Sequence, residues 1–217
     1  MIDVNLIERN LPLFFEGLKV TLLLSALAFA CALLVGLVLV LARLAKVRLL
    51  PAAAAAFVEL MRNTPVLVQM YFIFFGSAVM GWPLTGFTAG LIALAAQNGA
   101  YLCEIYRAGI GSVSRRQAEA GLALGMLQRQ AFFIVVLPQA LRKVIPPIAN
   151  QGVMLIKDTA LVSTLSVMEL MYQARLIADR TAAVYEVFFT LALFYLAITS
   201  AFTLAMRVLE WRLRVAE

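Results

Sequence analysis

The feature that most constrains this chain is a run of 23 residues without a charge, from Val20 to Ala42. With a rise of about 1.5 Å per residue, a helix of that length reaches about 35 Å, enough to cross a hydrocarbon core of about 30 Å. Of the 217 residues, 64% are hydrophobic and 14% are charged, which is more apolar surface than a soluble fold hides. We therefore expect an all-α membrane protein whose first span covers residues 20–42.

Further spans follow from the same pattern. Between Arg62 and Glu104 no residue is charged, and the run is too long for one helix. Glycines and a proline near its middle indicate two spans joined by a short turn. A later apolar segment is interrupted only by Lys157 and Asp158 and is expected to form a fourth span. The five spans expected in a single transmembrane domain over residues 1–217 are 20–42, 54–75, 87–106, 144–168 and 187–206.

Small residues recur at helical spacing in two of these spans. They are Ser25, Ala28, Ala32 and Gly36 in the first span, and Ala89, Ala93, Ala96 and Ala100 in the third. Such stripes let helix backbones approach closely in lipid. The alternative is that alanine is simply common in this chain.

The positive charges indicate the orientation. Lys and Arg concentrate in the cytoplasmic loops of membrane proteins. If the segments after the first, third and fifth spans share one side, that side holds all 18 Lys and Arg except Arg9, Lys19, Lys157, Arg175 and Arg180. We therefore expect the N-terminus outside and the C-terminus in the cytoplasm. The basic clusters are interpreted as orientation signals, and no nucleic acid partner is expected.

The polar segment 107–143 is long for a loop between spans, so we expect it to be a cytoplasmic interaction element. Ser114 and Gln117 fit a capping box, in which the Ser hydroxyl accepts from the backbone N–H of Gln117 and the Gln side chain reaches back. A short helix should start there and stop near Gly125, because glycine tolerates the left-handed conformation common at helix ends. A second, apolar helical piece should end at Pro138.

This loop resembles the EAA motif of ABC importer permeases. The family pattern is Glu-Ala-Ala, three residues, Gly, nine residues, then Ile-x-Leu-Pro, and the matching segments here are Glu119-Ala120-Gly121, Gly125 and Val135-Val136-Leu137-Pro138. Gly121 replaces the second Ala and Val135 replaces Ile. Other segments resemble the polar amino acid branch of the family: Arg62-Asn63-Thr64-Pro65, Glu104-Ile105-Tyr106-Arg107-Ala108-Gly109, Leu137-Pro138-Gln139-Ala140 and Lys157-Asp158-Thr159-Ala160-Leu161-Val162-Ser163. The similarity covers nearly the whole chain.

The resemblance implies a type I ABC importer fold in the cytoplasmic (inner) membrane of a bacterium, with an amino acid as substrate. The implied partners are ABC ATPase subunits, a second identical or related permease subunit, and an extracytoplasmic amino acid binding protein. The chain has no Gly-rich phosphate loop, so ATP and magnesium are expected on the partner ATPase, and no cofactor or catalytic residue in this chain. The residues expected to couple to the ATPase are Ser114, Glu119, Ala120, Gly121, Gly125, Leu137 and Pro138.

Polar side chains within the expected spans are candidates for the substrate pathway, because polar groups at membrane depth are costly. They are Gln69, Gln97, Asn98, Asn150, Gln151, Lys157, Asp158, Thr159 and Ser163. Hydrogen bonding between helices is an equally good role for the amides. Lys157 and Asp158 are adjacent and so lie on different helix faces, and we expect them at the outer part of the pathway.

Two pairs of opposite charges stand three residues apart, which places each pair on one helix face. Glu59 with Arg62 and Glu104 with Arg107 are expected to form structural ion pairs, and a substrate role is the alternative for Glu104. Histidine is absent, so no metal site is expected. Cys31 and Cys103 lie inside apolar runs and are interpreted as small buried residues.

Two other functional classes compete with the importer. An ion-coupled secondary transporter or channel subunit is the runner-up, but no inverted repeat is found and the long loop favours coupling to another protein. A membrane-embedded enzyme comes third, because the sequence offers no metal-ligand cluster and no pair of nucleophile and base.

Overall fold

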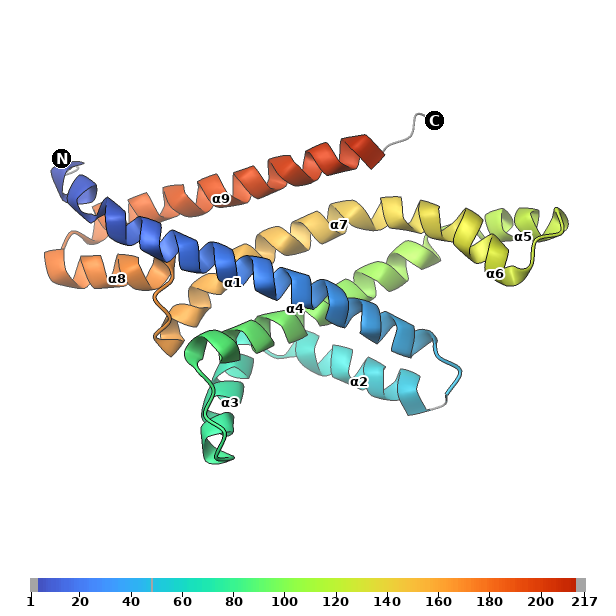
Figure 1. The fold of residues 1–217 in the computed structure, drawn as a ribbon, viewed down its shortest axis with the longest axis horizontal. Coiled ribbons are helices and arrows are strands. Elements are labelled where there is room, and N and C mark those ends of the chain that lie inside the picture. Colours follow the sequence, from blue (N-terminus) through green and yellow to red (C-terminus); the bar gives the residue numbers. More distant parts are fainter. Residues whose placement is uncertain (1–3, 48, 214–217) are drawn as a thin grey trace.

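All regular elements in the described part of the chain are helices, which confirms the expected all-α class (Figure 1). The computed structural model describes residues 4–47 and 49–213. In chain order the elements are α1 (Val4–Leu44), α2 (Leu49–Asn63), α3 (Val66–Val79), α4 (Gly86–Gly111), α5 (Arg115–Ala123), α6 (Gln128–Gln130), the π-helical turn η1 (Ala131–Val136), α7 (Leu137–Asp158), the 3-10 helix η2 (Thr159–Leu165), α8 (Leu170–Thr181) and α9 (Val184–Leu213).

Three of the expected spans fall inside the longest helices. α1 is 41 residues long and contains residues 20–42, while α4 is 26 residues long and contains residues 87–106. Among the described residues, three helical stretches are long and apolar enough to cross a membrane: Asn5–Leu44, Gln128–Leu165 and Val184–Arg212. The last of these contains the expected fifth span, 187–206.

The expected second span, 54–75, is wrong as a single helix, because the chain breaks between α2 and α3. Pro65 has an extended backbone, with φ of −63° and ψ of 136°. A proline disfavours the helical conformation of the preceding residue, here Thr64, and has no N–H to continue the ladder. α3 therefore leaves the direction of α2 and projects from the bundle (Figure 1).

The fourth helical segment begins earlier than expected. Residues 128–165 are helical throughout, so the expected helix end at Pro138 is wrong. Pro138 lies in the first turn of α7, directly after η1, where the Leu137 N–H donates to the Phe132 carbonyl five residues earlier. At the other end Ser166 adopts a left-handed backbone with φ of 61°, so residues 166–168 lie outside the helix.

The core is built mainly where α1 crosses α4. Ala28 and Ala32 on α1 are fully buried, as are Ala89, Ala93 and Ala100 on α4. A Cβ on Gly99 would lie 2.5 Å from Val35 Cγ1, and one on Gly36 would lie 2.8 Å from Leu102 Cβ. The small residues therefore allow the close approach that their spacing indicates, and α4 goes on to pack against α2, α3 and α7 as well.

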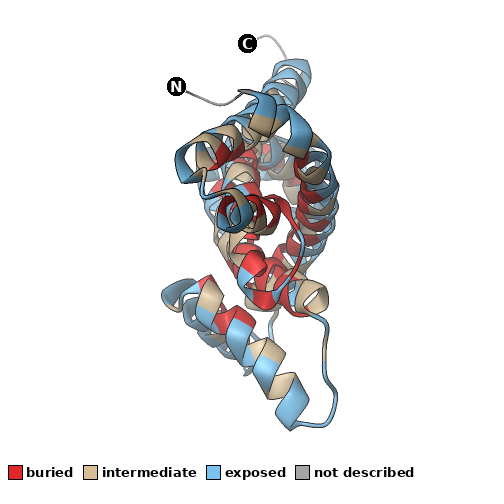
Figure 2. Cartoon of the chain, turned by 90° about the vertical axis from the view of Figure 1, so that its left-hand side faces the viewer, coloured by how far each residue is buried: buried red, intermediate tan, exposed pale blue. Residues whose placement is uncertain are grey.

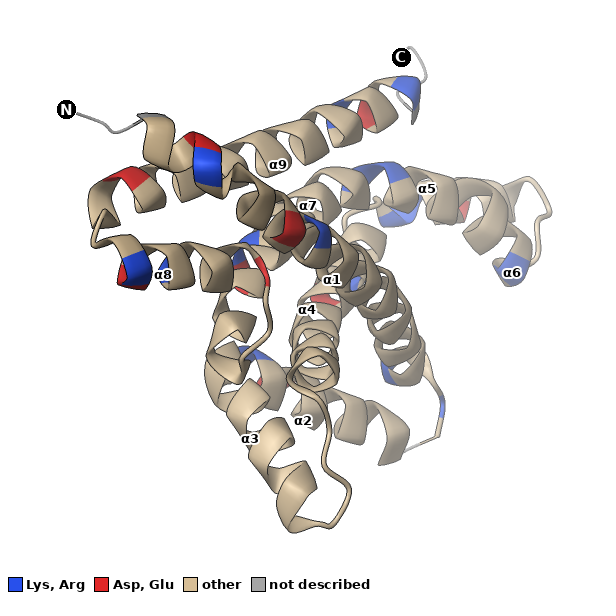
Figure 3. Ribbon diagram, turned by 60° about the vertical axis from the view of Figure 1, so that its left-hand side comes forward, with Lys and Arg blue, Asp and Glu red and all other residues tan. Residues whose placement is uncertain are grey.

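Much of the outward surface of the helices is exposed (Figure 2), and long stretches of it carry no charge (Figure 3). Leu34, Val38 and Leu41 on α1 and Leu196 and Leu204 on α9 are exposed. A soluble protein would place charges on such faces, whereas lipid solvates apolar side chains. Cys31 also lies on this exposed surface, so its expected burial is wrong, while Cys103 is buried.

The two ends of the molecule differ. α5 and α6 lie at one end, and α8 lies at the other, beside the N-terminal end of α1 (Figure 1). Charged residues gather toward these ends and leave long apolar stretches between them (Figure 3). The loop of α5 and α6 is thus separated from α8 by the length of the bundle.

Candidate functional site

The loop between α4 and α7 carries the short helix α5, which starts after Ser114 as expected. The predicted capping box is wrong: the Ser114 hydroxyl makes no capping bond, and the Gln117 N–H donates instead to the Ser114 backbone carbonyl at 2.9 Å. At the other end, Gly125 has a φ of 84°, which is the left-handed conformation predicted there.

α5 has one packed face and one free face. Gly121 is buried, and a Cβ at this position would lie 3.3 Å from both Ala131 Cβ and Met126 Sδ, so α5 lies closely on η1. Glu119 and Ala120 are exposed, and so is Leu124, with 81% of its surface accessible. The helix therefore presents a charged and apolar surface at the end of the molecule.

The base of this loop is tied together by α4 and α7. Lys143 Nζ donates to the carbonyl of Ser112 at 2.8 Å, so a side chain of α7 caps the end of α4. A Cβ on Gly109 would lie 2.0 Å from Val144 Cγ1, which shows how closely the two helices cross there. Sequence reasoning missed both contacts, although Gly109 stands within one of the recognised segments. Leu137 and Pro138 lie at the start of α7, half-buried and exposed respectively.

Two candidate pathway amides, Gln69 and Gln97, meet at the break between α2 and α3. Gln69 Nε2 donates to the carbonyls of Met61 (2.9 Å) and Thr64 (3.2 Å), and Gln97 Nε2 donates to the Thr64 carbonyl at 3.0 Å. The backbone groups released by Pro65 are thus satisfied by side chains. For these two residues the geometry favours the interhelical role.

A second pair of amides joins α4 to α7. Gln151 Nε2 donates to Asn98 Oδ1 at 2.7 Å, and Asn98 Nδ2 donates to the Leu94 carbonyl at 2.8 Å. Both side chains are buried. Asn150 is exposed on another face of α7 and does not join this pair.

The remaining pathway candidates lie where α7 passes into η2. Lys157 is exposed and Asp158 is half-buried, and neither forms an ion pair with a described residue. Thr159 is fully buried and its hydroxyl donates to the Ile156 carbonyl at 2.7 Å. Ser163 donates in the same way to the Ala160 carbonyl at 2.7 Å, so both hydroxyls retain their acceptor capacity.

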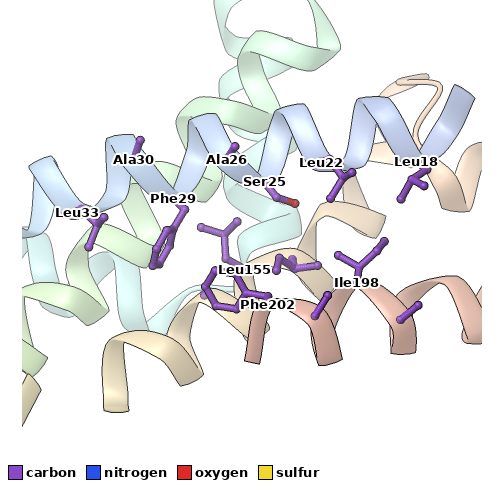
Figure 4. A pocket seen from close by; sticks show the side chains of 14 residues that line it. Leu18, Leu22, Ser25, Ala26, Phe29, Ala30, Leu33, Leu155, Ile198 and Phe202 are labelled. Atoms are coloured by element: carbon purple, nitrogen blue, oxygen red, sulfur yellow. The ribbon is translucent and has the colours of Figure 1, made fainter. Parts of the chain in front are cut away.

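Two cavities accompany these residues. The larger, of about 710 Å³, lies between α1, α7 and α9 and is lined almost wholly by apolar side chains such as Leu22, Phe29 and Phe202 (Figure 4). Ser25 supplies the hydroxyl in its wall. The smaller cavity, of about 430 Å³, is polar and lies between α3, η2 and α8. The smaller one has the chemistry to hold a polar molecule.

Comparison with known proteins places the chain in a family. The family model described as binding-protein-dependent transport system inner membrane component matches residues 32–215. The chain belongs to this family. The permease is 36% identical to the glutamine transport system permease protein GlnP of Escherichia coli (strain K12), over 98% of each chain. It is 37% identical to the L-cystine transport system permease protein TcyB of Bacillus subtilis (strain 168), over 96% of this chain and 90% of the relative.

Solved structures agree with this assignment. The permease superposes on an amino acid ABC transporter crystallised with histidines with a TM-score of 0.92 and 33% identity, over 98% of this chain and 99% of the other. A chain of the MetNI methionine ABC transporter, in an inward-facing conformation, gives a TM-score of 0.70 at 17% identity, which shows a shared fold. The expected type I importer fold is therefore confirmed, together with the resemblance to ABC importer permeases.

One of the two expected ion pairs is present in this permease. Glu104 accepts from Arg107 on its own helix at 2.6 Å and also from Arg43 at the end of α1. The pair of Glu59 with Arg62 is wrong: both side chains are exposed, and the Arg62 guanidinium lies 5.3 Å from the centre of the Tyr101 ring. Cation–π stacking occupies Arg62 in place of the carboxylate.

Sequence reasoning missed a buried carboxylate at Glu169. Its oxygens accept from the backbone N–H groups of Met171 (2.9 Å) and Tyr172 (2.8 Å), so Glu169 caps the N-terminus of α8. The Tyr195 hydroxyl on α9 donates to the same carboxylate at 3.1 Å, and Thr21 on α1 accepts from the Leu170 N–H at 3.1 Å. One side chain thus fastens α8 to α9 beside α1.

The described residues of the permease contain no group of three or more His, Cys, Asp or Glu side chains that could hold a metal ion. The charged and polar side chains described above instead form small groups across helix contacts, which suits positioning and recognition.

Proposed function

We propose that this permease forms the route by which an amino acid enters the cell, driven by ATP hydrolysis on a partner ATPase. The names of its relatives support an amino acid as cargo: glutamine for one, L-cystine for another, and histidines in the similar solved structure. The single observation that carries the ATP-driven mechanism is α5, a short helix with an exposed face that packs on η1 at the end of the bundle, in a loop whose base is tied together by α4 and α7.

Force from the ATPase would enter through α5. The exposed residues Glu119, Leu122 and Leu124 offer one charge and two apolar contacts to a groove on the ATPase. Because Gly121 fits closely against Ala131, a movement of α5 is transmitted to η1 and α7 rather than absorbed by a loose contact. The expected coupling residues would thus move as one unit.

α7 then carries the movement to the candidate substrate groups. It has 22 residues, so it is about 33 Å long, and it runs from Leu137 near the coupling loop to Asp158. Asp158 and Lys157 supply unpaired charges that an amino acid's ammonium and carboxylate could use. Asn98, Gln151, Asn150, Thr159 and Ser163 complete the set of polar groups on or next to this helix, while Gln69 and Gln97 support the helix break.

The assembly we infer contains more than this chain. A bundle of this size does not enclose a passage, so a second identical or related permease subunit is needed. ABC ATPase subunits would bring ATP and magnesium to α5, and an extracytoplasmic amino acid binding protein would deliver the substrate near α8. The complex would lie in the inner membrane of a bacterium, with the N-terminus outside and the C-terminus in the cytoplasm.

Uptake into vesicles tests the proposal. The permease is reconstituted with the ATPase and binding protein that co-purify with it, and uptake of each of the twenty labelled L-amino acids is measured. We expect uptake of at least one of them to require ATP on the side of the membrane where the ATPase is bound. This uptake should persist when ionophores remove all ion gradients. Uptake driven by an ion gradient without ATP would instead establish the secondary transporter.

A pair of variants tests α5 directly. Glu119→Ala should let the ATPase hydrolyse ATP without matching uptake, because the charged contact at the ATPase is lost. Gln117→Ala is the matched control, since Gln117 is also exposed on α5 and its side chain carries no charge and forms no hydrogen bond with a described residue. Equal amounts of amino acid transported per ATP in the two variants would remove Glu119 from the coupling role.

A further inference from the structure

A polar cavity of about 430 Å³ lies at the end of the molecule that carries α8. Its walls come from three elements that are distant in sequence: Tyr71 on α3, Ser163 and Ser166 at the end of η2, and Tyr172, Arg175 and Asp179 on α8. Unlike the larger cavity in Figure 4, it is lined mostly by polar surface. A cavity of this volume is large enough for a free amino acid and too polar to attract a lipid chain.

Two opposite charges face this cavity side by side. Arg175 and Asp179 are four residues apart on α8, which places them on one helix face with their Cβ atoms about 6 Å apart. Both side chains are exposed, and neither forms an ion pair or a hydrogen bond with another described residue. Both charges are therefore available to a ligand.

This spacing matches the charges of an α-amino acid. The ligand carries a carboxylate and an ammonium on the same carbon, and a guanidinium next to a carboxylate offers a complementary partner for each. A simple anion would be repelled by Asp179, and a simple cation by Arg175. The pair therefore selects a zwitterion over either kind of ion.

Hydroxyl groups complete the surroundings. Tyr71 and Tyr172 bring phenol groups from α3 and α8, and neither hydroxyl forms a hydrogen bond with a described residue, while the Tyr71 ring lies against that of Phe75. Ser166 lines the cavity from a left-handed backbone with φ of 61°, where η2 ends. Such groups donate and accept, so they suit the polar ends of many side chains and do not by themselves select one amino acid.

The cavity is also connected to the candidate pathway. Ser163 lies in its wall and belongs to η2, which continues directly from α7 after Asp158. Only the four residues 159–162 thus separate Ser163, in the wall of the cavity, from Asp158, the last residue of α7. α8, which supplies the charged pair, lies at the end of the bundle opposite α5 (Figure 1).

From these observations we propose that the cavity between α3, η2 and α8 binds a zwitterionic α-amino acid on its way into the permease, with Arg175 holding the α-carboxylate and Asp179 the α-ammonium. The site is distinct from Lys157 and Asp158 and precedes them on the route. The proposal rests on the amino acid import proposed above, because it assigns one step of that import to these side chains.

Direct binding to the permease–ATPase complex in lipid nanodiscs tests the site, with the binding protein left out. The probe is the labelled L-amino acid that gives the highest uptake in the vesicle survey. Two competitors differ from it by one charge each: its α-carboxamide, which lacks the carboxylate, and its des-amino analogue, which lacks the ammonium. We expect the unmodified complex to bind the zwitterion saturably and at least about tenfold more tightly than either analogue, since one charge-assisted hydrogen bond is worth about 1.5–3 kcal/mol.

Each variant should lose one half of this discrimination. Arg175→Gln should bind the zwitterion about tenfold more weakly and no longer distinguish it from the α-carboxamide, while it still rejects the des-amino analogue. Asp179→Asn should show the reverse pattern. The charge swap R175D/D179R keeps both charges and should recover part of the affinity. Arg180→Gln is the control, because Arg180 is exposed on the same helix and does not line the cavity.

Three results would overturn the site. The first is that the unmodified complex shows no saturable binding, and the second is that both variants discriminate among the three compounds as the unmodified complex does. The third is that the variants alter only the stimulation of ATP hydrolysis by the binding protein, in which case this surface is a protein-docking site. The import proposal fails separately, when no amino acid is taken up with ATP. If import continues and the variants bind all three compounds as the unmodified complex does, only the role of the cavity is disproved.

Discussion

Glu104 stands between two arginines, Arg107 from its own helix and Arg43 from α1, so its carboxylate joins the ends of two helices. The three side chains are only partly exposed, at 19%, 54% and 23% respectively. Glu104→Gln would leave two guanidinium groups facing each other without a counter-charge. We expect a loss of about 2 kcal/mol of stability, which for a chain of this size lowers the Tm by about 4–8 °C in a detergent or nanodisc melting experiment.

The expected pair that did not form supplies the control for this prediction. Glu59 is exposed and forms no ion pair with a described residue. Glu59→Gln should therefore shift the Tm by no more than about 1 °C, as for most exposed charges. If the two substitutions lowered the Tm equally, the bridge between α1 and α4 would not be a stabilising contact.

Gly125 permits a second prediction at the level of one residue. Its φ of 84° disfavours any side chain, yet a Cβ there would meet no atom within 4 Å. Gly125→Ala thus isolates the backbone effect, about 1–2 kcal/mol against the turn that ends α5. We expect fewer amino acids transported per ATP hydrolysed, and a smaller loss in Gly125→Asn because Asn tolerates this conformation.

The matched control for Gly125 is Gly76→Ala. Gly76 also has free space around its Cα, but it lies inside α3 with an ordinary helical backbone. Alanine there should be neutral or slightly stabilising. If Gly125→Ala and Gly76→Ala transported equal numbers of amino acids per ATP hydrolysed, a side chain at residue 125 would not strain the turn after α5.

Spacing along a helix made some of these residues predictable and others not. Glu104 and Arg107 are three apart on one helix, so their pairing follows from local geometry. Arg43 was not assigned to the pair, because the contact between α1 and α4 depends on how the helices cross. Arg62 illustrates the opposite error: its spacing from Glu59 was suitable, but the ring of Tyr101 from another helix competes for the guanidinium.

At the scale of helices, the break between α2 and α3 depends on side chains from two elements. Gln69 and Gln97 both donate to the carbonyl of Met61, which has no helical partner because Pro65 lacks an N–H, and to the carbonyl of Thr64 at the break. The double substitution Q69L/Q97L should cost about 1–3 kcal/mol for each carbonyl left unsatisfied, seen as a lower Tm. If these amides only support the helix break, the double substitution should lower the Tm and change the apparent affinity for the amino acid little.

Tyr101→Phe is the control at this break. The Tyr101 hydroxyl donates to the Arg62 carbonyl at only 3.4 Å, which is a weak bond, so its removal should cost little. A large increase in the apparent KM of Q69L/Q97L with an unchanged Tm would reverse the assignment and make the two glutamines part of the substrate route.

The crossing of α4 and α7 gives a prediction about coupling. Gly109→Ala would bring a Cβ to 2.0 Å from Val144 Cγ1, so the two helices must separate beside the coupling loop. We expect a loss of stability of about 1–3 kcal/mol and a lower ratio of transport to ATP hydrolysis. Removing the clash in the double variant G109A/V144A should restore much of both quantities.

Gly111 is the matched control for that crossing, because it lies two residues further along α4 and has nothing within 4 Å of its Cβ position. Gly111→Ala should be neutral or stabilising by up to about 1 kcal/mol. Equal losses in Gly109→Ala and Gly111→Ala would show that the backbone of α4, rather than its contact with α7, limits coupling.

Helix boundaries were predictable where charges or turns bound an apolar run, and not where proline acted within one. The positions of α4 and α9 follow from uncharged stretches. The sequence does indicate the break at Thr64–Pro65, since a residue before proline avoids the helical conformation, but the uninterrupted apolar run favoured one continuous helix. Pro138 was misjudged for the opposite reason: the π-helical turn before it lets one helix continue from residue 128 to residue 165.

For the whole molecule, the arrangement of its two ends predicts which one faces the cytoplasm. The loop of α5 and α6 and the α8 segment lie at opposite ends of the bundle (Figure 1). Most Lys and Arg belong to the end that carries α5, which is the pattern of a cytoplasmic face. Everything proposed for α5 requires this orientation, because the ATPase can reach only the cytoplasmic end.

Single cysteines test this orientation in intact cells. In a background where Cys31 and Cys103 are replaced by Ser, Leu124→Cys places a thiol at an 81% exposed position next to α5, and Arg180→Cys places one on α8. A membrane-impermeant maleimide should label Arg180→Cys from outside and Leu124→Cys only after the membrane is permeabilised. Retained uptake shows that each variant is folded. Labelling of Leu124→Cys in intact cells would then place α5 outside the cell, where the ATPase cannot reach it, and would disprove the coupling role.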